Sequence, residues 1–324
     1  MNRTRSLVKG GRPMSRSDSA PRVPIAAIAA VLGGAAVCAA AVAWRRRASG
    51  VIASRRTAFG RARVIDTHDD EGEPIRVLSV SGTYQSATYL GDRYTEPVFP
   101  YMLAYDHAFD DGASVRSILM IGGGGYAYPK HLVATRPEAR IDVVEVDPVI
   151  TELARKYFFL NRLIADYDLA ATGRLGIVCA DGRAFLDAHD GAHAYDAVLN
   201  DAFAGGTPVA SLMSEAAARS IRGNLTDGGA YLTNVVSALA GPQADLLDDV
   251  TMTIGRVFAH VYVIPGSPDE PTVPDNNVVI ATDAARRFVG AVEVRAATSA
   301  RPASEAFGDG VPVNAVDGME RTRL

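Results

Sequence analysis

A glycine-rich turn and three later carboxylates are the residues of this chain best suited to chemistry. Gly122–Gly125 follow one apolar run, Glu145 ends the next apolar run 23 residues after Gly122, and Asp181 and Asp201 follow two further runs. Glycines let a backbone approach a ligand closely, and a carboxylate at the end of the following strand can accept both hydroxyls of a ribose. This spacing predicts an adenosine site, with the binding residues Gly122, Gly124, Glu145, Asp181 and Gly182.

The glycine turn is compatible with more than one ligand. Gly122-x-Gly124-x-x-Ala127 formally fits the fingerprint of dinucleotide-binding proteins, which favours NAD. Four glycines followed by Tyr126, with no requirement for a pyrophosphate cradle, suit S-adenosylmethionine at least as well. A simpler interpretation stays open, in which the glycines form a tight turn, the acids are solvated strand ends, and Asp201 is a helix N-cap or turn residue.

A doubly wound α/β sheet would bring these residues to one edge, because parallel strands deliver polar groups at their carboxyl ends. Apolar strand-like runs and helical segments alternate along the chain after residue 113. The expected strands are 115–121, 141–146, 175–179, 197–199, 230–236, 260–264 and 277–282, and the expected helices are 130–135, 148–159, 211–224 and 244–257. A loop rich in Pro and Asp, without a helix, joins the last two strands, so we expect an antiparallel last strand.

Charge is distributed unevenly. Residues 1–63 hold 13 of the 33 Lys and Arg residues and one of the 37 acids, so the rest of the chain is strongly negative. Such a body would repel a phosphate backbone, which argues against a nucleic-acid partner. The two cysteines, Cys38 and Cys179, form neither a disulfide framework nor a CxxC clip, and the sequence has no HExxH motif, so we expect no metal.

Residues 25–44 form a run of 20 residues without charge, which as a helix would span the ~30 Å hydrocarbon core of a membrane. Three arginines, 45–47, follow the run directly and favour a single-pass anchor in the cell membrane with a cytoplasmic catalytic domain. A cleaved signal peptide with its small-residue site at 41–43, or a segment lying on the membrane surface, are the alternatives.

The remaining segments complete the expected organisation. Alternating apolar residues in 76–80 and 83–89, separated by Ser81-Gly82, predict a small antiparallel β-unit. The expected domains are a basic tail at 1–23, a transmembrane helix at 24–44, a basic linker at 45–63, a small N-terminal β-unit at 64–112, a Rossmann-like catalytic domain at 113–290 and a disordered tail at 291–324.

Residues 75–290 resemble the spermidine synthase family of aminopropyltransferases, within the class I S-adenosylmethionine methyltransferase fold. The segments that carry the resemblance are Ser81-Gly-Thr-Tyr-Gln85, Tyr101, Ile121-Gly-Gly-Gly124, Val144-Glu-Val-Asp-Pro148, Ala180-Asp-Gly182 and Tyr195-Asp-Ala-Val-Leu-Asn-Asp201. The resemblance implies that Glu145 binds the ribose, that Asp181 lies near the adenine, and that Asp201 orients or deprotonates an attacking amine. Gln85 and Tyr101 would line the opposite wall of the pocket.

Three departures from the family pattern concern charged substrates. Gly125 stands where the family has an Asp for the ammonium of an aminopropyl donor, Ala204 stands where a second Asp helps to bind a diamine, and Met102-Leu103 replace a His-Glu pair. An unpaired ammonium in a partly buried site costs several kcal/mol, so ordinary aminopropylation of putrescine is disfavoured. The segment 201–206 resembles instead divergent bacterial spermidine synthase-like proteins, which are often attached to membranes.

The leading hypothesis is a transferase related to polyamine biosynthesis. Its donor would be S-adenosylmethionine or decarboxylated S-adenosylmethionine, its acceptor a small amine or another nucleophile, and its base Asp201, with either an aminopropyl or a methyl group transferred. A membrane-anchored, non-catalytic adenosine-ligand protein derived from the family is the alternative, and a nicotinamide oxidoreductase is a third hypothesis. The sequence leaves a homodimer open.

Overall fold

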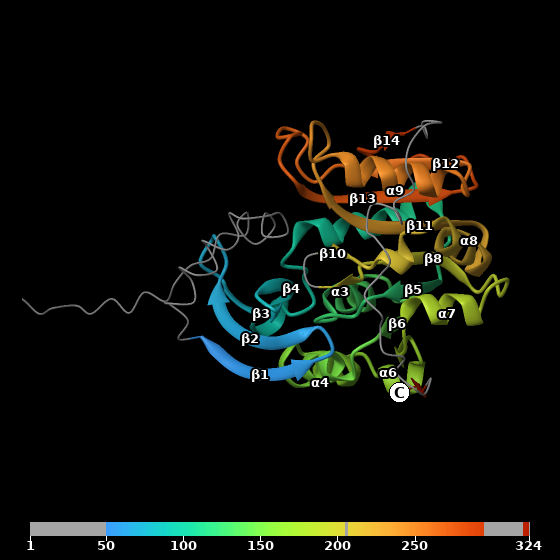
Figure 1. Cartoon of the computed structure of the whole chain (residues 1–324). Coiled ribbons are helices and arrows are strands. Elements are labelled where there is room, and N and C mark those ends of the chain that lie inside the picture. Colours follow the sequence, from blue (N-terminus) through green and yellow to red (C-terminus); the bar gives the residue numbers. More distant parts are fainter. Residues whose placement is uncertain (1–49, 205–206, 295–319, 324) are drawn as a thin grey trace, which may run out of the picture.

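The computed structural model describes residues 50–204, 207–294 and 320–323, and this part contains two main sheets (Figure 1). A four-stranded antiparallel sheet, in the order β1-β2-β3-β4, lies beside a nine-stranded sheet. The expected basic tail at 1–23 and transmembrane helix at 24–44 lie outside the described residues. Within the described ranges, no helix combines the length and the apolar character that crossing a membrane requires.

The N-terminal sheet begins earlier than the expected boundary at residue 64. Its strands are β1 (Val51–Thr57), β2 (Gly60–His68), β3 (Pro74–Val80) and β4 (Thr83–Tyr89). Residues 51–63, expected to be linker, therefore form a strand and the start of a second one. The arginines that made this segment look like a linker occupy strand positions; Arg55, for example, pairs with Glu152 at 3.2 Å. The predicted turn at Ser81-Gly82 is confirmed, with positive φ at both residues.

The large sheet has the predicted doubly wound arrangement with an antiparallel strand. Its order is β14-β12-β13-β11-β8-β5-β6-β7-β15. The central strands are β5 (Ser117–Ile121), β6 (Arg140–Glu145), β7 (Leu175–Cys179), β8 (Tyr195–Asn200), β11 (Leu225–Ser237), β12 (His260–Ile264) and β13 (Asp275–Thr282). β5 pairs in parallel with β6 and β8, whereas β13 is antiparallel to both of its neighbours, β11 and β12. The prediction of an antiparallel last strand before the tail is confirmed.

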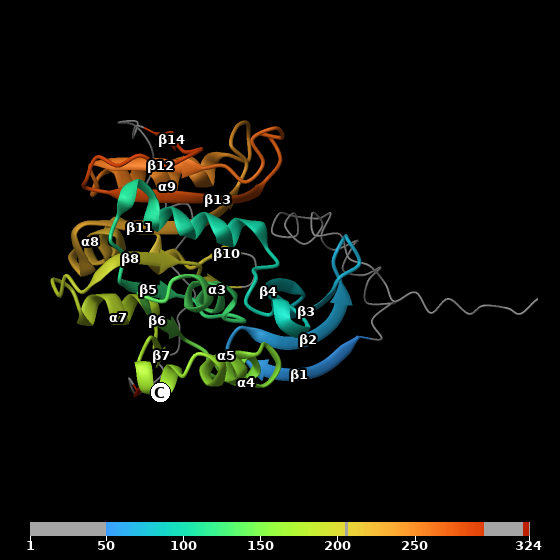
Figure 2. The same ribbon diagram turned by 180° about the vertical axis from the view of Figure 1, so that it is seen from behind.

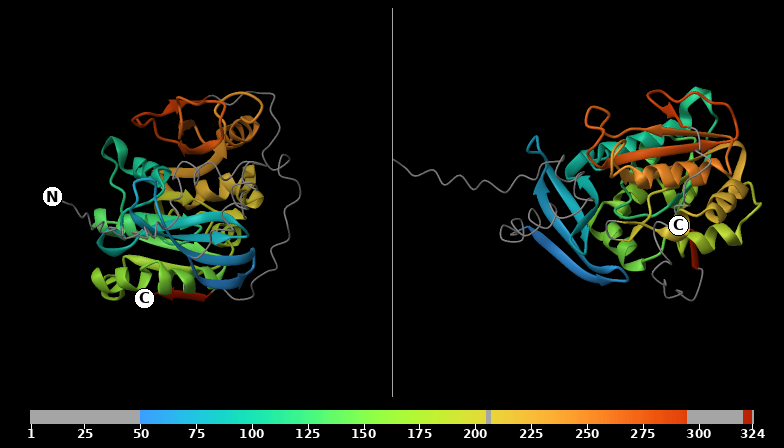
Figure 3. Two further views of the ribbon diagram at one scale, coloured as in Figure 1. Left: turned by 90° about the vertical axis from the view of Figure 1, so that its left-hand side faces the viewer. Right: turned by 45° about the horizontal axis from the view of Figure 1, so that its top comes forward.

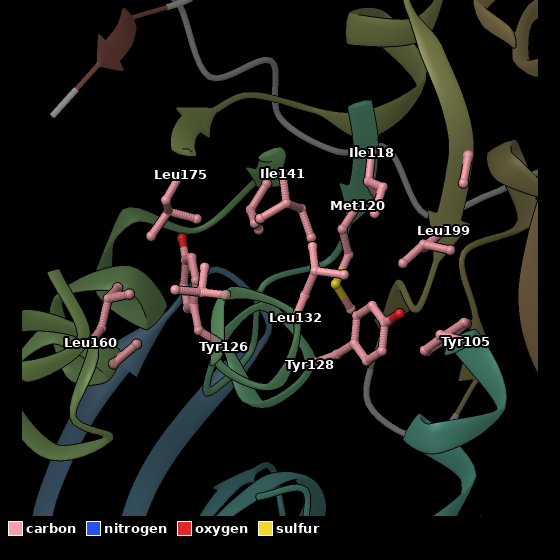
Figure 4. Close-up of a cluster of buried hydrophobic side chains, with 14 of the residues drawn as sticks. Tyr105, Ile118, Met120, Tyr126, Tyr128, Leu132, Ile141, Leu160, Leu175 and Leu199 are labelled. Atoms are coloured by element: carbon pink, nitrogen blue, oxygen red, sulfur yellow. The ribbon is translucent and has the colours of Figure 1, made fainter. Parts of the chain in front are cut away.

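Helices cover both faces of this sheet (Figure 2). The helices are α3 (Ala127–Thr135), α4 (Pro148–Tyr157), α5 (Leu160–Asp166), α6 (Leu169–Thr172), α7 (Gly182–Ala188), α8 (Glu215–Asn224) and α9 (Asp245–Gly255), with 3-10 helices η2 (Gly91–Arg93), η3 (Pro100–Gly112) and η4 (Ala210–Leu212). Ile118 and Met120 of β5 belong to one buried cluster with side chains of α3 to α6, and Figure 4 shows Leu132 beside Met120. Leu119 and Ile121 belong to a second cluster, with side chains of α7 to α9. The alternation along β5 thus builds two cores.

The tail at 291–324, expected to be disordered, contributes two short strands. β14 (Val292–Glu293) pairs antiparallel with β12, and β15 (Glu320–Arg323) pairs antiparallel with β7, so they lie at opposite edges of the sheet (Figure 3). An edge strand offers unpaired backbone N–H and C=O groups that a segment can join whatever its hydrophobic pattern. Composition therefore did not reveal these two strands.

Lys130 of α3 links the helix after the glycine turn to the N-terminal sheet. Its side chain is 1% exposed, and Nζ donates to Thr88 Oγ1 of β4 at 2.7 Å and to the Phe158 carbonyl at 3.1 Å. Burial lowers the pKa of Lys130 from 10.5 to about 7. The contact between the two sheets therefore includes a buried amine held only by neutral oxygens among the described residues.

We expect Lys130 to make stability depend on pH. Between about pH 7 and pH 10 the unfolded chain binds a proton that the folded chain has released, so the free energy of unfolding should rise with pH, by at most about 1.4 kcal/mol per unit. The Lys130→Met variant should lack this rise, and Lys156→Met, at an exposed lysine, should keep it. Urea titrations at several pH values measure the difference, and parallel profiles for wild type and Lys130→Met would contradict the expectation.

Candidate active site

The polar residues singled out in the sequence lie at the carboxyl-terminal edge of the large sheet. The backbone joins three of its strand ends there: the Gly122 N–H donates to the Val144 carbonyl at 2.9 Å, and the Asp201 N–H donates to the Ile121 carbonyl at 2.9 Å. The glycine turn therefore lies between the ends of β6 and β8. Gly122, Glu145 and Asp201 are brought to one place.

Position 122 requires glycine because the backbone of Asp201 passes close to it. The φ of Gly122 is +93°, and a Cβ atom here would lie 2.7 Å from the Asp201 carbonyl oxygen. Any side chain would push the end of β8 away from the turn. Gly124 also has a positive φ, of +50°. Both glycines are thus explained by backbone geometry, and their contact with a ligand stays a prediction.

The Glu145 carboxylate holds the glycine turn in place. It is buried, and its Oε2 accepts hydrogen bonds from the N–H groups of Gly123 at 2.9 Å and Gly124 at 3.1 Å, while Oε1 accepts from the Asp147 N–H at 3.0 Å. Burial raises the pKa of Glu145, and the three N–H donors oppose that rise. The sequence predicts a carboxylate that faces a ribose; the structure shows that the same group also organises the loop.

Asp181 and Gly182 have structural roles in the same region. Asp181 is the N-cap of α7, with Oδ1 accepting from the Ala184 N–H at 2.9 Å. Gly182 lets α7 pack closely on β5, because a Cβ here would collide with Ile121 Cγ2. Neither contact requires a ligand, so the predicted adenine-side roles of these two residues stay predictions.

Asp201 is the acid with the most distinctive surroundings. The Tyr101 hydroxyl donates to its Oδ2 at 3.1 Å, and Asn234 Nδ2 donates to its Oδ1 at 3.2 Å. Burial raises the pKa of the Asp201 carboxyl, and it also raises the pKa of Tyr101, which keeps the tyrosine hydroxyl protonated as a donor. No helix begins directly after Asp201, so helix capping does not explain this residue; a short strand, β9 (Phe203–Ala204), follows and pairs with β10 (Thr207–Pro208).

Asn234 is a site residue that the sequence analysis missed. It lies in β11, is 1% exposed, and its Nδ2 also donates to Asn276 Oδ1 of β13 at 3.0 Å. Its own Oδ1 has no hydrogen-bond partner in the described structure. The available signal was a polar amide within the apolar run 230–236. Asn234 connects Asp201 to the antiparallel strand and fixes the orientation of its carboxylate.

Of the two residues expected on the opposite wall, Tyr101 meets Asp201, and Gln85 lies against the glycine turn. The pairing of β3 with β4 shifts between Leu78 and Ser79, which pair with Ser86 and Tyr84 and leave Gln85 as the extra residue of a bulge. Bulges commonly re-aim a side chain beside a functional site. The Gln85 carbonyl lies 3.9 Å from the position of a Cβ at Gly124. Contact of either residue with a substrate stays a prediction.

Gly125, where the family pattern has an acid, is tightly packed by neighbouring side chains. A Cβ here would lie 2.6 Å from Ser86 Oγ and 3.1 Å from Phe158 Cδ1. An Asp at this position would require the Ser86 hydroxyl to rotate away and Ser86 Cβ and the Phe158 ring to shift by a few tenths of an ångström. The side chains of Ser86 and Phe158 therefore occupy the space that a side chain at position 125 would need.

Comparison with known proteins assigns this part of the chain. The family described as "Spermine/spermidine synthase domain" matches residues 102–267. A polyamine aminopropyltransferase of Vibrio vulnificus is 28% identical over 197 residues, covering 59% of this chain and 61% of the relative. A putrescine N-methyltransferase 2 of Nicotiana tabacum is 29% identical over 163 residues, covering 50% of this chain and 42% of the relative. The chain thus matches less than two thirds of the length of these curated relatives.

The solved structures agree on the fold. A probable spermidine synthase from Corynebacterium glutamicum superposes with a TM-score of 0.60 at 21% identity, covering 73% of this chain and 81% of that one. Spermidine synthase from Thermotoga maritima gives a TM-score of 0.55 at 20% identity, covering 74% of each chain. At these identities the similarity establishes a shared Rossmann-like methyltransferase fold.

We expect Glu145→Ala to affect both the fold and the predicted nucleoside site. Three backbone N–H groups, two of them buried, lose their acceptor, so the free energy of unfolding should fall by about 1–3 kcal/mol. The affinity for S-adenosylmethionine should also fall as the turn loosens. Urea denaturation and isothermal titration measure the two effects. Glu270→Ala, which removes an exposed carboxylate, is the control. Unchanged stability in Glu145→Ala would show that the turn does not depend on this carboxylate.

Proposed function

This chain belongs to the spermine/spermidine synthase family, and on that premise we propose that it transfers a carbon group from an S-adenosylmethionine-type donor to a small amine. The observation that carries the proposal is Asp201, whose backbone crosses Gly122 and whose carboxylate accepts hydrogen bonds from Tyr101 and Asn234. A carboxylate fixed in that position is suited to orient an amine and to take its proton.

The proposed reaction is a direct displacement at carbon. The acceptor nitrogen forms a bond to the carbon attached to the sulfonium, the carbon–sulfur bond breaks, and its electron pair stays on sulfur as a neutral thioether. The proton lost by the nitrogen passes to Asp201. The protein contributes mainly alignment and a base whose affinity for a proton is increased by burial.

Both an aminopropyl and a methyl group are compatible with this site. The relatives of this chain include polyamine aminopropyltransferases and putrescine N-methyltransferases. An acid beside the donor would favour decarboxylated S-adenosylmethionine by pairing with its ammonium and repelling a carboxylate. Gly125 provides no such group, which supports weak discrimination between the two donors.

We also propose attachment of the chain to a membrane through residues 25–44, on the evidence of the uncharged run and the three arginines after it. The full chain should sediment with membranes after an alkaline carbonate wash, and a variant lacking residues 24–44 should stay in the supernatant. Release of the full chain by carbonate would contradict anchoring.

We expect Asp201→Asn to abolish product formation while the protein stays folded and binds the donor. In the wild type, kcat/KM should fall as the pH is lowered through the raised pKa of Asp201, because only the carboxylate accepts a proton. Tyr101→Phe removes a donor that stabilises the carboxylate, so this fall should begin at a higher pH.

Mass spectrometry of products from a panel of amines, with each donor, tests this expectation. Asp227→Asn, at an exposed acid in the β11 segment, is the control and should behave as wild type. Full activity in Asp201→Asn would remove Asp201 from the reaction, and an absence of product from every pair of donor and amine would favour the non-catalytic alternative.

A further inference from the structure

The acids around the candidate site are almost all committed to the protein itself. Glu145 accepts three backbone N–H groups, and Asp181 caps α7. Asp106 of η3 accepts the Tyr128 hydroxyl at 3.1 Å and meets His131 Nε2 at 3.0 Å. Asp275 accepts the Ser267 hydroxyl and the Asn276 N–H. These four acids are used by the fold, whereas Asp201 lies partly exposed at the end of β8 with its carboxylate held by Tyr101 and Asn234.

The segments next to Asp201 carry no charge. The sequence from Ala202 to Ser214, which contains β9, β10 and η4, has no Lys, Arg, His, Asp or Glu. Ala204, three residues after Asp201, is exposed and would be the natural position for a second acid. A cation bound at Asp201 would thus find no second anionic group along this segment.

The opposite side of Asp201 is aromatic. The ring of Tyr101 stacks on that of Phe99 with centroids 6.3 Å apart, and it meets the ring of Tyr105 edge-on at 6.5 Å. Phe99 and Tyr105 are buried, and the Tyr105 hydroxyl donates a hydrogen bond to the Asn200 carbonyl at 3.3 Å. Aromatic faces favour an apolar body and can support one ammonium through the ring quadrupole.

From this arrangement we propose that the acceptor is an amine with a single positive charge and an apolar body, not a diamine. The inference rests on the proposed function and names its substrate class. The amine nitrogen lies at Asp201, loses its proton to that carboxylate and attacks the donor carbon, while the apolar body lies against Tyr101 and the uncharged residues Ala202–Ala204. The second ammonium of a diamine would lose water without gaining an anionic partner, which is unfavourable.

The test compares two acceptors of matched length on the full chain. In n-pentylamine a methyl group replaces the terminal ammonium of putrescine. Isothermal titration in the presence of 5′-methylthioadenosine measures binding, and mass spectrometry with each donor measures turnover. We expect n-pentylamine to bind at least tenfold more tightly than putrescine. Equal affinity, or a preference for putrescine, would overturn the inference.

Two variants test the cause of this preference. Ala204→Asp supplies the missing acid and should shift the affinity ratio toward putrescine by at least tenfold, while Ala171→Asp, in the remote α6, should leave the ratio unchanged. An unchanged ratio in Ala204→Asp would overturn the charge argument. A chain that binds n-pentylamine as expected but turns over no amine would reject the proposed function and leave only the charge preference of the site. A chain that turns over putrescine in preference to n-pentylamine would overturn this inference and keep the proposed function, so the two failures are distinguishable.

Discussion

The hydrogen bonds from Gly123, Gly124 and Asp147 to the Glu145 carboxylate are the interaction on which the candidate site depends. They fix the glycine turn against the end of β6. The fixed turn sets the path of Gly122 under the Asp201 backbone, and this crossing places Asp201 within reach of Tyr101 and Asn234. A buried carboxylate with three backbone donors is costly to disturb, so the loop and the base behave as one unit.

Hydrophobic patterning predicted the core of the fold because the central strands are buried on both faces and read as continuous apolar runs. The strand at 175–179 illustrates this. Hydrophobic patterning did not predict the strands that form by backbone pairing without burying their side chains. Residues 51–57 form a strand although most of them are exposed, and the tail strands depend on the open backbone of an edge. Such pairings leave little trace in side-chain types.

The candidate site was predictable in part for a similar reason. Strand order brings Gly122, Glu145 and Asp201 to one edge, and their spacing in the sequence was enough to expect it. Hydrogen bonds between side chains and loop backbone depend on local geometry that spacing does not encode. The loop-holding role of Glu145, the cap at Asp181 and the contact of Asn234 with Asp201 therefore became visible only in three dimensions.

The two tail strands have a consequence for how copies of this protein could associate. β14 and β15 pair with the outer strands β12 and β7 of the nine-stranded sheet, at its opposite edges. A sheet whose outermost long strands are already paired offers a neighbour little backbone to extend into a continuous intermolecular sheet. Strand addition at the large sheet would therefore meet these short tail strands before the longer strands β12 and β7. Helical faces and the N-terminal sheet are then the surfaces left for a second subunit.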